Sequence, residues 1–261
     1  MPIIYQPKGR AQEYSWLAIN HYIGCGHGCT YCYARGIIQR TGADFDKPKV
    51  RKNVLELLAK EAPKFKGTQE RVLLCFTCDP YQLLDISERM TRKVIKILKQ
   101  YDIPFQVLTK GGMRAARDFD LYEQGDAFAA TMTFLSEDKS RQFEPHAAPP
   151  SLRIKAMEAA HKQGIETWVS LEPVLNAQES LKIIHRLHNV VDHFKLGKLN
   201  YQKTNIDWRE YVIKALELLH KYKKSYCIKN DLAKHLGDYA YCNKDTRTIP
   251  SPAALERGQR R

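Results

Sequence analysis

The chain has 261 residues, of which 43% are hydrophobic, so it is long enough for one large folded domain and is not disordered. No run approaches the roughly 20 apolar residues that a membrane-spanning helix needs, and the N-terminal residues lack the apolar core of a signal peptide. We therefore expect a cytoplasmic protein with no membrane partner. The 42 lysines and arginines outnumber the 29 aspartates and glutamates, and the net charge of +13 favours a polyanionic partner over a surface charged only for solubility.

Six apolar, β-branched runs alternate with helical patterns along the chain. The predicted strands cover residues 16–21, 72–77, 105–109, 127–134, 167–171 and 191–197. The predicted helices cover residues 53–60, 86–101, 113–122, 151–163, 177–188 and 208–222. Asp85, with Glu88 three residues later, has the pattern of a capped start for the second of these helices. Strands that are each followed by a helix predict a parallel sheet with right-handed crossovers.

Six strand–helix units are too few for a closed eight-stranded barrel. We therefore expect an α/β fold in which residues 1–224 form a partial, open (β/α)6 barrel. Residues 225–261 form the predicted C-terminal extension, with a candidate strand at 225–229 and a mobile basic tail at 244–261. Ligands of such folds bind at the C-terminal ends of the strands.

Basic residues gather at three places, residues 47–52, 221–224 and 257–261. Tyr222 and Tyr226 are interleaved with the second group, and clusters of this kind suit phosphate contacts and base stacking. A further basic rim, at the end of the sixth predicted strand, is formed by Lys195, Lys198 and Asn200. This rim suits a phosphate at the mouth of the barrel.

Three cysteines follow the first predicted strand, in the segment GCGHGCTYCY at residues 24–33. Cys25, Cys29 and Cys32 have the spacing C-x3-C-x2-C, and three glycines let the backbone fold tightly around a compact inorganic group. Thiolates are the usual ligands of iron–sulfur clusters. A cubane that is held by three cysteines has one iron left open, which can chelate the amino and carboxylate groups of a small molecule. Zinc with His27 as a fourth ligand is the alternative, but His27 lies between two ligands, where the geometry is cramped.

This spacing, with an aromatic residue just before the third cysteine, resembles that of the radical S-adenosylmethionine (SAM) superfamily. The resemblance implies a [4Fe–4S] cluster on Cys25, Cys29 and Cys32 whose open iron binds SAM, in a partial barrel of the radical SAM type. It also implies an external reductant such as flavodoxin or ferredoxin, whose electron cleaves SAM to a 5′-deoxyadenosyl radical. That radical abstracts a hydrogen atom from the substrate.

Further motifs are similar to those of the spore photoproduct lyase-like group, whose members are often labelled DNA repair photolyases. They are YQPKGRA at 5–11, CYA at 32–34, CDPYQ at 78–82 and WVSLEP at 168–173, and the resemblance spans roughly residues 5–200. It implies that Tyr31 and Tyr33 take part in cofactor binding and hydrogen transfer, with packing beside the cluster as the alternative. It also implies that Asp79 accepts a hydrogen bond from the SAM ammonium and that Lys110 donates to its carboxylate.

The chain departs from this group at two places. Cys78 stands where a serine is expected, and the Gly-Gly-Glu motif of the wider superfamily is absent. Cys78 follows the second predicted strand and is the candidate thiol that returns a hydrogen to the product radical, whereas Cys75 is expected to be a small buried residue. A second cluster on Cys75, Cys78, Cys227 and Cys242 is an open alternative.

Other polar residues lie at the same edge of the predicted sheet. Thr131 and Thr133, at the end of the fourth strand, are candidate partners of the cofactor ribose or carboxylate. Glu144 and Glu172 are candidate cofactor or substrate contacts, with turn chemistry beside Pro145 and Pro173 as the alternative.

The leading interpretation is a lyase-like radical SAM enzyme that acts on a nucleic acid or nucleotide and repairs or modifies a base. In a duplex substrate that base must leave the stack. One alternative is a radical SAM enzyme that acts on a small metabolite or peptide. The other is a non-catalytic iron–sulfur or zinc module that binds nucleic acid.

Overall fold

The computed structural model describes residues 2–199, 203–237 and 242–243. The predicted tail at 244–261 and Asn200 therefore lie outside the described residues. The chain divides into two compact units: unit 1 comprises Met1–Ala130 and Ser136–Glu166, and unit 2 comprises Thr131–Leu135 and Thr167–Arg261. None of the described helices has the length and apolar character needed to cross a membrane.

Within its described residues, unit 1 is built on four strands that pair in parallel. Their order in the sheet is β1 (Leu17–Ile19), β4 (Val72–Leu74), β5 (Phe105–Thr109) and β6 (Ala127–Thr131). Every residue of β1, β4 and β6 is buried, which is the pattern of parallel strands covered on both faces. The α/β fold class predicted from the alternating strands and helices is confirmed.

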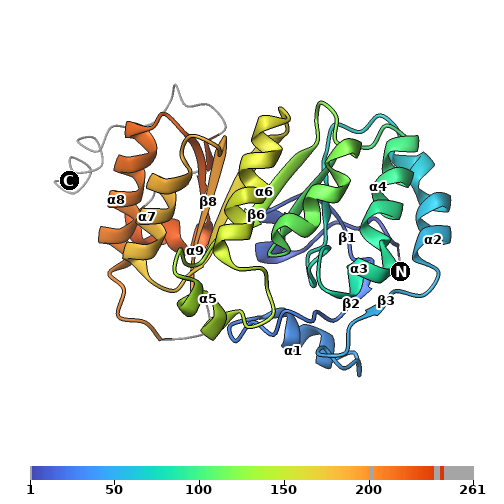
Figure 1. Cartoon of the computed structure of the whole chain (residues 1–261), viewed down its shortest axis with the longest axis horizontal. Coiled ribbons are helices and arrows are strands. Elements are labelled where there is room, and N and C mark those ends of the chain that lie inside the picture. Colours follow the sequence, from blue (N-terminus) through green and yellow to red (C-terminus); the bar gives the residue numbers. More distant parts are fainter. Residues whose placement is uncertain (1, 200–202, 238–241, 244–261) are drawn as a thin grey trace. The chain divides into compact units, whose positions relative to one another are not determined.

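Six described α-helices surround these strands in unit 1. They are α1 (Ala34–Gln39), α2 (Val54–Glu61), α3 (Leu84–Glu88), α4 (Met90–Gln100), α5 (Glu137–Phe143) and α6 (Pro150–Lys162). Three 3-10 segments accompany them, η1 (Gly9–Glu13), η2 (Ala62–Phe65) and η3 (Gly112–Leu121). The helix α2 packs beside α4, and α6 packs against η3 (Figure 1). On α4, Val94, Ile95 and Leu98 form the buried stripe that fixes the helix on the core.

The first predicted strand, at 16–21, is shorter in the structure. It is followed by a small two-stranded antiparallel sheet that the pattern did not predict, in which β2 (Tyr22–Ile23) pairs with β3 (Lys49–Val50). Residues 24–48, which carry the three cysteines and α1, lie between these two strands in the sequence, so the pairing brings the two ends of this segment together.

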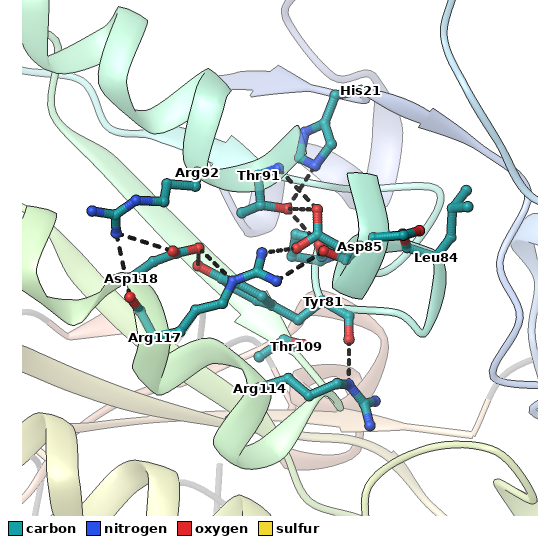
Figure 2. Close-up of polar contacts among 12 residues, drawn as sticks. His21, Tyr81, Leu84, Asp85, Thr91, Arg92, Thr109, Arg114, Arg117 and Asp118 are labelled. Carbon is teal, nitrogen blue, oxygen red and sulfur yellow. Dashed lines mark hydrogen bonds and ion pairs between the residues drawn. The ribbon is translucent and has the colours of Figure 1, made fainter. Parts of the chain in front are cut away.

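The predicted helix at 86–101 is broken in two. Arg89 adopts a left-handed conformation with φ of 48°, so α3 ends there and α4 begins at the next residue. Asp85 is not the cap of a helix that starts at 86, because it lies inside α3. Its carboxylate instead accepts from the backbone N–H of Thr91, at 3.0 Å, in the first turn of α4 (Figure 2). The aspartate therefore does satisfy a helix start, but one turn later than predicted.

In its described residues, unit 2 has three strands that pair in parallel and one that is antiparallel. The parallel strands are β7 (Glu166–Val174), β8 (His193–Lys198) and β9 (Ser225–Ile228), and β10 (Cys242–Asn243) runs antiparallel to β9. The helices α7 (Ala177–Leu187) and α8 (Trp208–Lys221) pack side by side (Figure 1), and α9 (Asn230–Ala233) and η4 (Lys234–Leu236) follow β9. Tyr226 is buried in β9, so the prediction that it stacks on bases is wrong.

Candidate functional site

The three predicted ligands lie together in the cysteine loop, which we define as residues 24–33, between β2 and α1. Cys25 and Cys29 are each 8% exposed, Cys32 is half-buried, and all three are free thiols. The N–H of Cys32 donates to the carbonyl oxygen of Cys29 at 3.2 Å, and Cys25 packs against Ala34 and Phe45. The loop is therefore a folded turn at the edge of a core cluster.

Glycine is required at the entry of this loop. Gly24 has φ of +83°, and a Cβ atom there would lie 2.5 Å from the carbonyl oxygen of Phe45. That same oxygen accepts the N–H of Cys25 at 2.9 Å. The close approach of two backbone segments thus places the first cysteine, and only a residue without a side chain permits it.

Burial keeps two of the thiols protonated in the metal-free protein. Burial, with the nearby carboxylate of Asp79, raises the pKa of Cys25 to about 12. Burial also raises the pKa of Cys29 to about 11, although the ammonium of Lys110 opposes this. Because metal ligands bind as thiolates, a cluster that enters this loop must displace these protons.

The donor set is three free cysteine thiols in one loop, and thiolates are the usual ligands of iron–sulfur clusters. Among the described residues, no group of three His, Cys, Asp or Glu side chains is arranged to hold a single metal ion. The Nε2 of His27, the alternative zinc ligand, lies 3.1 Å from Asp79 Oδ2.

The second cluster that the sequence left open is not supported. Cys227 is disulfide-bonded, so it offers no thiolate to a cluster. The side chain of Cys242 lies outside the described residues, although its backbone pairs in register with that of Cys227.

Asp79 and Lys110 follow the adjacent strands β4 and β5, and the structure brings them together as predicted. Asp79 is 8% exposed and accepts hydrogen bonds from Thr109 Oγ1 and the N–H of Lys110, each at 2.6 Å, and from the N–H of Tyr81 at 2.8 Å. Burial alone would raise the pKa of Asp79, but the imidazole of His27 and these donors hold it well below its usual range. Asp79 is therefore a fixed anion beside the cysteine loop.

Tyr31 is held by a buried ion pair that the sequence did not predict. Its hydroxyl donates to Glu144, which is 1% exposed and lies 2.6 Å from the guanidinium of Arg153. Lys110 Nζ lies 5.6 Å from the centroid of the Tyr31 ring. Burial lowers the pKa of Lys110, but Cys29 and Glu144 outweigh it and raise the pKa above its usual value, so the ammonium stays charged.

The remaining candidates of unit 1 lie around the end of β4. Tyr33 is 45% exposed and donates from its hydroxyl to the carbonyl oxygen of Phe76 at 3.1 Å. Cys78 is half-buried and packs against the core cluster that contains Cys25. Cys75 is buried, as predicted, and its sulfur lies 3.2 Å from Nδ1 of His21, a neighbour that no spacing in the sequence indicated.

The other candidates belong to unit 2. Thr131 and Thr133 are both buried, and Thr133 Oγ1 has no hydrogen-bond partner among the described residues. Glu172 pairs with the buried Lys229 at 2.6 Å. Of the predicted basic rim, Lys195 places its ammonium 4.4 Å from the centroid of the Trp168 ring. Lys198 Nζ lies 3.3 Å from Nε2 of His235.

A family model described as the radical SAM superfamily matches residues 19–189. This span includes the cysteine loop, Cys75, Cys78, Asp79, Lys110, Thr131, Thr133, Glu144 and Glu172. It covers well over half of the chain.

The related sequences are themselves uncharacterised. A protein of Mycobacterium tuberculosis is 29% identical over 60% of this chain and 49% of its own length. A protein of Methanocaldococcus jannaschii is 25% identical over 60% of each chain, and one of Acidianus two-tailed virus is 27% identical over 64% of this chain and 58% of its own. The chain thus spans about half the length of the first curated relatives that it matches.

Solved structures share the fold. Spore photoproduct lyase with bound SAM and dinucleoside spore photoproduct matches with a TM-score of 0.66 and 16% identity, over 83% of this chain and 76% of that one. Streptococcus suis SuiB bound to SAM matches with a TM-score of 0.62 and 9% identity, over 86% of this chain and 52% of that one. At these identities the similarity shows the fold, which is the radical SAM partial barrel expected from the sequence.

The sequence, the site and the family model therefore agree. Members of the matched superfamily use a [4Fe–4S] cluster and SAM, the two cofactors that the cysteine loop predicts, and the loop of this chain has the free thiols and the burial that such a cluster requires. The chain belongs to the radical SAM superfamily.

Proposed function

We propose that this protein is an enzyme that cleaves SAM reductively and directs the resulting 5′-deoxyadenosyl radical at a nucleic-acid base, in a repair or modification reaction of the lyase-like type. The observation that carries the radical chemistry is the loop with three free thiols, Cys25, Cys29 and Cys32, inside the span of the family model. When bound, the cluster supplies the electron and its open iron the anchor for SAM. The residues of this chain bind and orient the cofactor around it.

Lys110 is proposed to donate to the SAM carboxylate. Its support is the persistent positive charge described above and its position after β5, close to Cys29 and the Tyr31 ring. Tyr31 is proposed to line the same cofactor pocket. Thr131 and Thr133 are proposed ribose or carboxylate partners, and the buried hydroxyl of Thr133, which has no described partner, supports this for Thr133. For Asp79 the predicted contact is with the SAM ammonium.

Cys78 is proposed to return a hydrogen atom to the product radical, with Tyr33 and Tyr31 as the hydrogen-transfer residues that the family resemblance suggests. The thiol of Cys78 is free and lies against the core cluster of Cys25, so it is near the cysteine loop. The hydroxyl of Tyr33 lies at the end of β4, beside the segment that leads to Cys78.

The nucleic-acid substrate rests on charge and on one structural neighbour. The net charge is +13, and spore photoproduct lyase, whose fold this chain shares, binds a dinucleoside photoproduct. Lys195 and Lys198 on β8 are proposed phosphate contacts. An external reductant such as flavodoxin or ferredoxin and a cytoplasmic location stay predictions.

Deuterium transfer tests the substrate class. The reconstituted enzyme is incubated anaerobically with dithionite, SAM and uniformly deuterated DNA or RNA oligonucleotides, and in parallel with deuterated peptide and metabolite mixtures. The proposal predicts deuterium in 5′-deoxyadenosine from a nucleic acid, together with binding that weakens steeply as salt rises. Deuterium that comes only from peptides or metabolites, or no binding to nucleic acid at low salt, contradicts it.

A further inference from the structure

His27 lies in the middle of the cysteine loop, two residues from both Cys25 and Cys29, and is buried. Its Nε2 lies 3.1 Å from Asp79 Oδ2, within ion-pair distance, but neither ring nitrogen has a hydrogen bond of standard geometry among the described residues. The contact with Asp79 brings the His27 ring next to the segment that follows β4. Burying an imidazole without hydrogen-bond partners costs free energy, so the burial of His27 calls for an explanation.

Three of the roughly four lone-pair positions of the Asp79 carboxylate accept hydrogen bonds. Oδ1 accepts from Tyr81 N–H and Thr109 Oγ1, and Oδ2 accepts from Lys110 N–H and faces His27. In this arrangement Asp79 ties the end of β5 to the cysteine loop.

A second side chain of the same segment holds the loop three residues further on. Gln82 is fully buried, accepts the N–H of Gly26 at 2.9 Å and donates to the carbonyl oxygen of Gly24 at 3.3 Å. Segment 79–82 therefore contacts the loop on both sides of Cys25.

Two hydrogen bonds of Tyr81 join this segment to η3 (Figure 2). The hydroxyl of Tyr81 donates to Asp118 at 3.1 Å, and its carbonyl oxygen accepts from Nε of Arg114 at 2.8 Å. Asp118 also pairs with Arg92 at 3.2 Å. Segment 79–82 is therefore held by η3, which is itself paired with α4, and it can hold the cysteine loop in a fixed position.

We propose that His27 is a positioning residue for the cluster, held by Asp79 and supported by Gln82, which together fix the spacing of Cys25 and Cys29. The DPYQ motif at 79–82 then also acts as a clamp on the cysteine loop. The proposal rests on the proposed function only in taking the three cysteines as cluster ligands. Outer-shell partners of this kind typically change metal affinity by about 10–100-fold when they are replaced.

The test compares His27→Gln, His27→Asn, Asp79→Asn and Gln82→Leu with wild type. A glutamine amide reaches the position of Nε2, whereas an asparagine amide reaches only that of Nδ1, so Gln keeps the contact with Asp79 and Asn loses it. The control His193→Gln removes an imidazole of β8 that contacts Ser225 Oγ at 2.9 Å. Far-UV circular dichroism and thermal midpoints of the iron-free proteins identify any variant that fails to fold.

The first readout needs no iron. Hydrogen exchange in peptides that cover residues 24–33 of the iron-free protein is expected to be at least about tenfold faster in His27→Asn, Asp79→Asn and Gln82→Leu than in wild type. His27→Gln and the control are expected to match wild type. Equal protection in all variants overturns the clamp, whatever the chemistry of the loaded enzyme.

The second readout is the half-life of the reconstituted [4Fe–4S] absorbance under an iron chelator, with the dissociation constant of SAM measured on the loaded protein. We expect His27→Asn and Asp79→Asn to release iron about 10–100-fold faster, with rescue in His27→Gln. A weaker SAM affinity in Asp79→Asn with unchanged iron retention overturns the proposal, because Asp79 then serves the ammonium. A wild type that holds the cluster but does not cleave SAM contradicts the proposed function and leaves the clamp standing.

Discussion

The hydroxyl of Tyr31 donates to the carboxylate of Glu144, a residue 113 positions away in the sequence. Glu144 in turn pairs with Arg153 at 2.6 Å, and both charged side chains are almost fully buried. A residue of the cysteine loop is thus connected to α6 through a buried ion pair. Such a pair adds little net stability, but it is costly to break from one side.

Glu144→Gln is expected to destabilise the iron-free protein by ~3–5 kcal/mol, because it leaves Arg153 buried without its counter-charge. Urea denaturation measures the change. Glu56→Gln is the matched control, since Glu56 pairs with Lys60 on the exposed face of α2 and its loss is expected to change the stability far less. Equal effects of the two substitutions would mean that the Glu144–Arg153 pair is solvated in solution.

The same pair predicts a dependence on pH. Burial alone would raise the pKa of Glu144, but Arg153 and Lys110 outweigh it, so the folded pKa lies below the unfolded value. Its stabilisation is therefore fully present above the unfolded pKa, ~4.3, and is lost as the pH falls through the folded pKa. The stability gap between wild type and Glu144→Gln should stay constant from about pH 6 to 8 and shrink below about pH 4. A gap that widens in acid contradicts this assignment.

Asp85, which follows segment 79–82, is the centre of a polar network (Figure 2). Its buried carboxylate accepts from Tyr22, Thr91 and Arg117. Asp85→Ala is expected to cost ~3–5 kcal/mol, measured by chemical denaturation, because three donors lose a buried acceptor.

Asp120→Ala is the control for that substitution. Asp120 contacts Arg92 at 2.7 Å, but its side chain is 57% exposed, so its loss is expected to cost at most ~1 kcal/mol. A larger loss for Asp120 than for Asp85 would show that burial does not decide the strength of this network.

Two glycines of the same region predict opposite results. Gly24→Ala is expected to destabilise the protein and lower iron uptake, because its Cβ would meet the Phe45 carbonyl oxygen at 2.5 Å with φ of +83°. Gly36→Ala, in α1, meets nothing within 4 Å and is expected to stabilise by ~0.5–1 kcal/mol. Thermal midpoints and iron per chain after reconstitution measure both. Normal iron uptake in Gly24→Ala contradicts the close approach at the loop entry.

Features that depend on nearby residues could be predicted from the sequence. The limits of β5, Phe105–Thr109, agree with the prediction at both ends, because a short apolar run bounded by Pro104 and Gly111 leaves little choice. The three cysteines were found from their spacing alone. The break at Arg89 was not, since no local propensity predicts an arginine in the left-handed conformation.

The partners of the site residues could not be predicted, because they are distant in sequence. The order of the strands placed Asp79 and Lys110 on adjacent strand ends, and this is confirmed. No periodicity connects Asp79 with His27, or Tyr31 with Glu144, because those contacts depend on how the loops fold over the strand ends. Glu144 was expected on the ligand edge, but its role as the partner of Tyr31 and Arg153 is visible only in the structure.

The most direct test of the central claim is the formation of 5′-deoxyadenosine. The protein is reconstituted anaerobically with iron and sulfide, reduced with dithionite and mixed with SAM, and the product is quantified by chromatography. Wild type and Thr30→Ala, whose exposed side chain neighbours Cys29, are expected to form it, whereas Cys29→Ala is expected to form none above background. No product from wild type, or as much from Cys29→Ala as from wild type, contradicts the radical assignment.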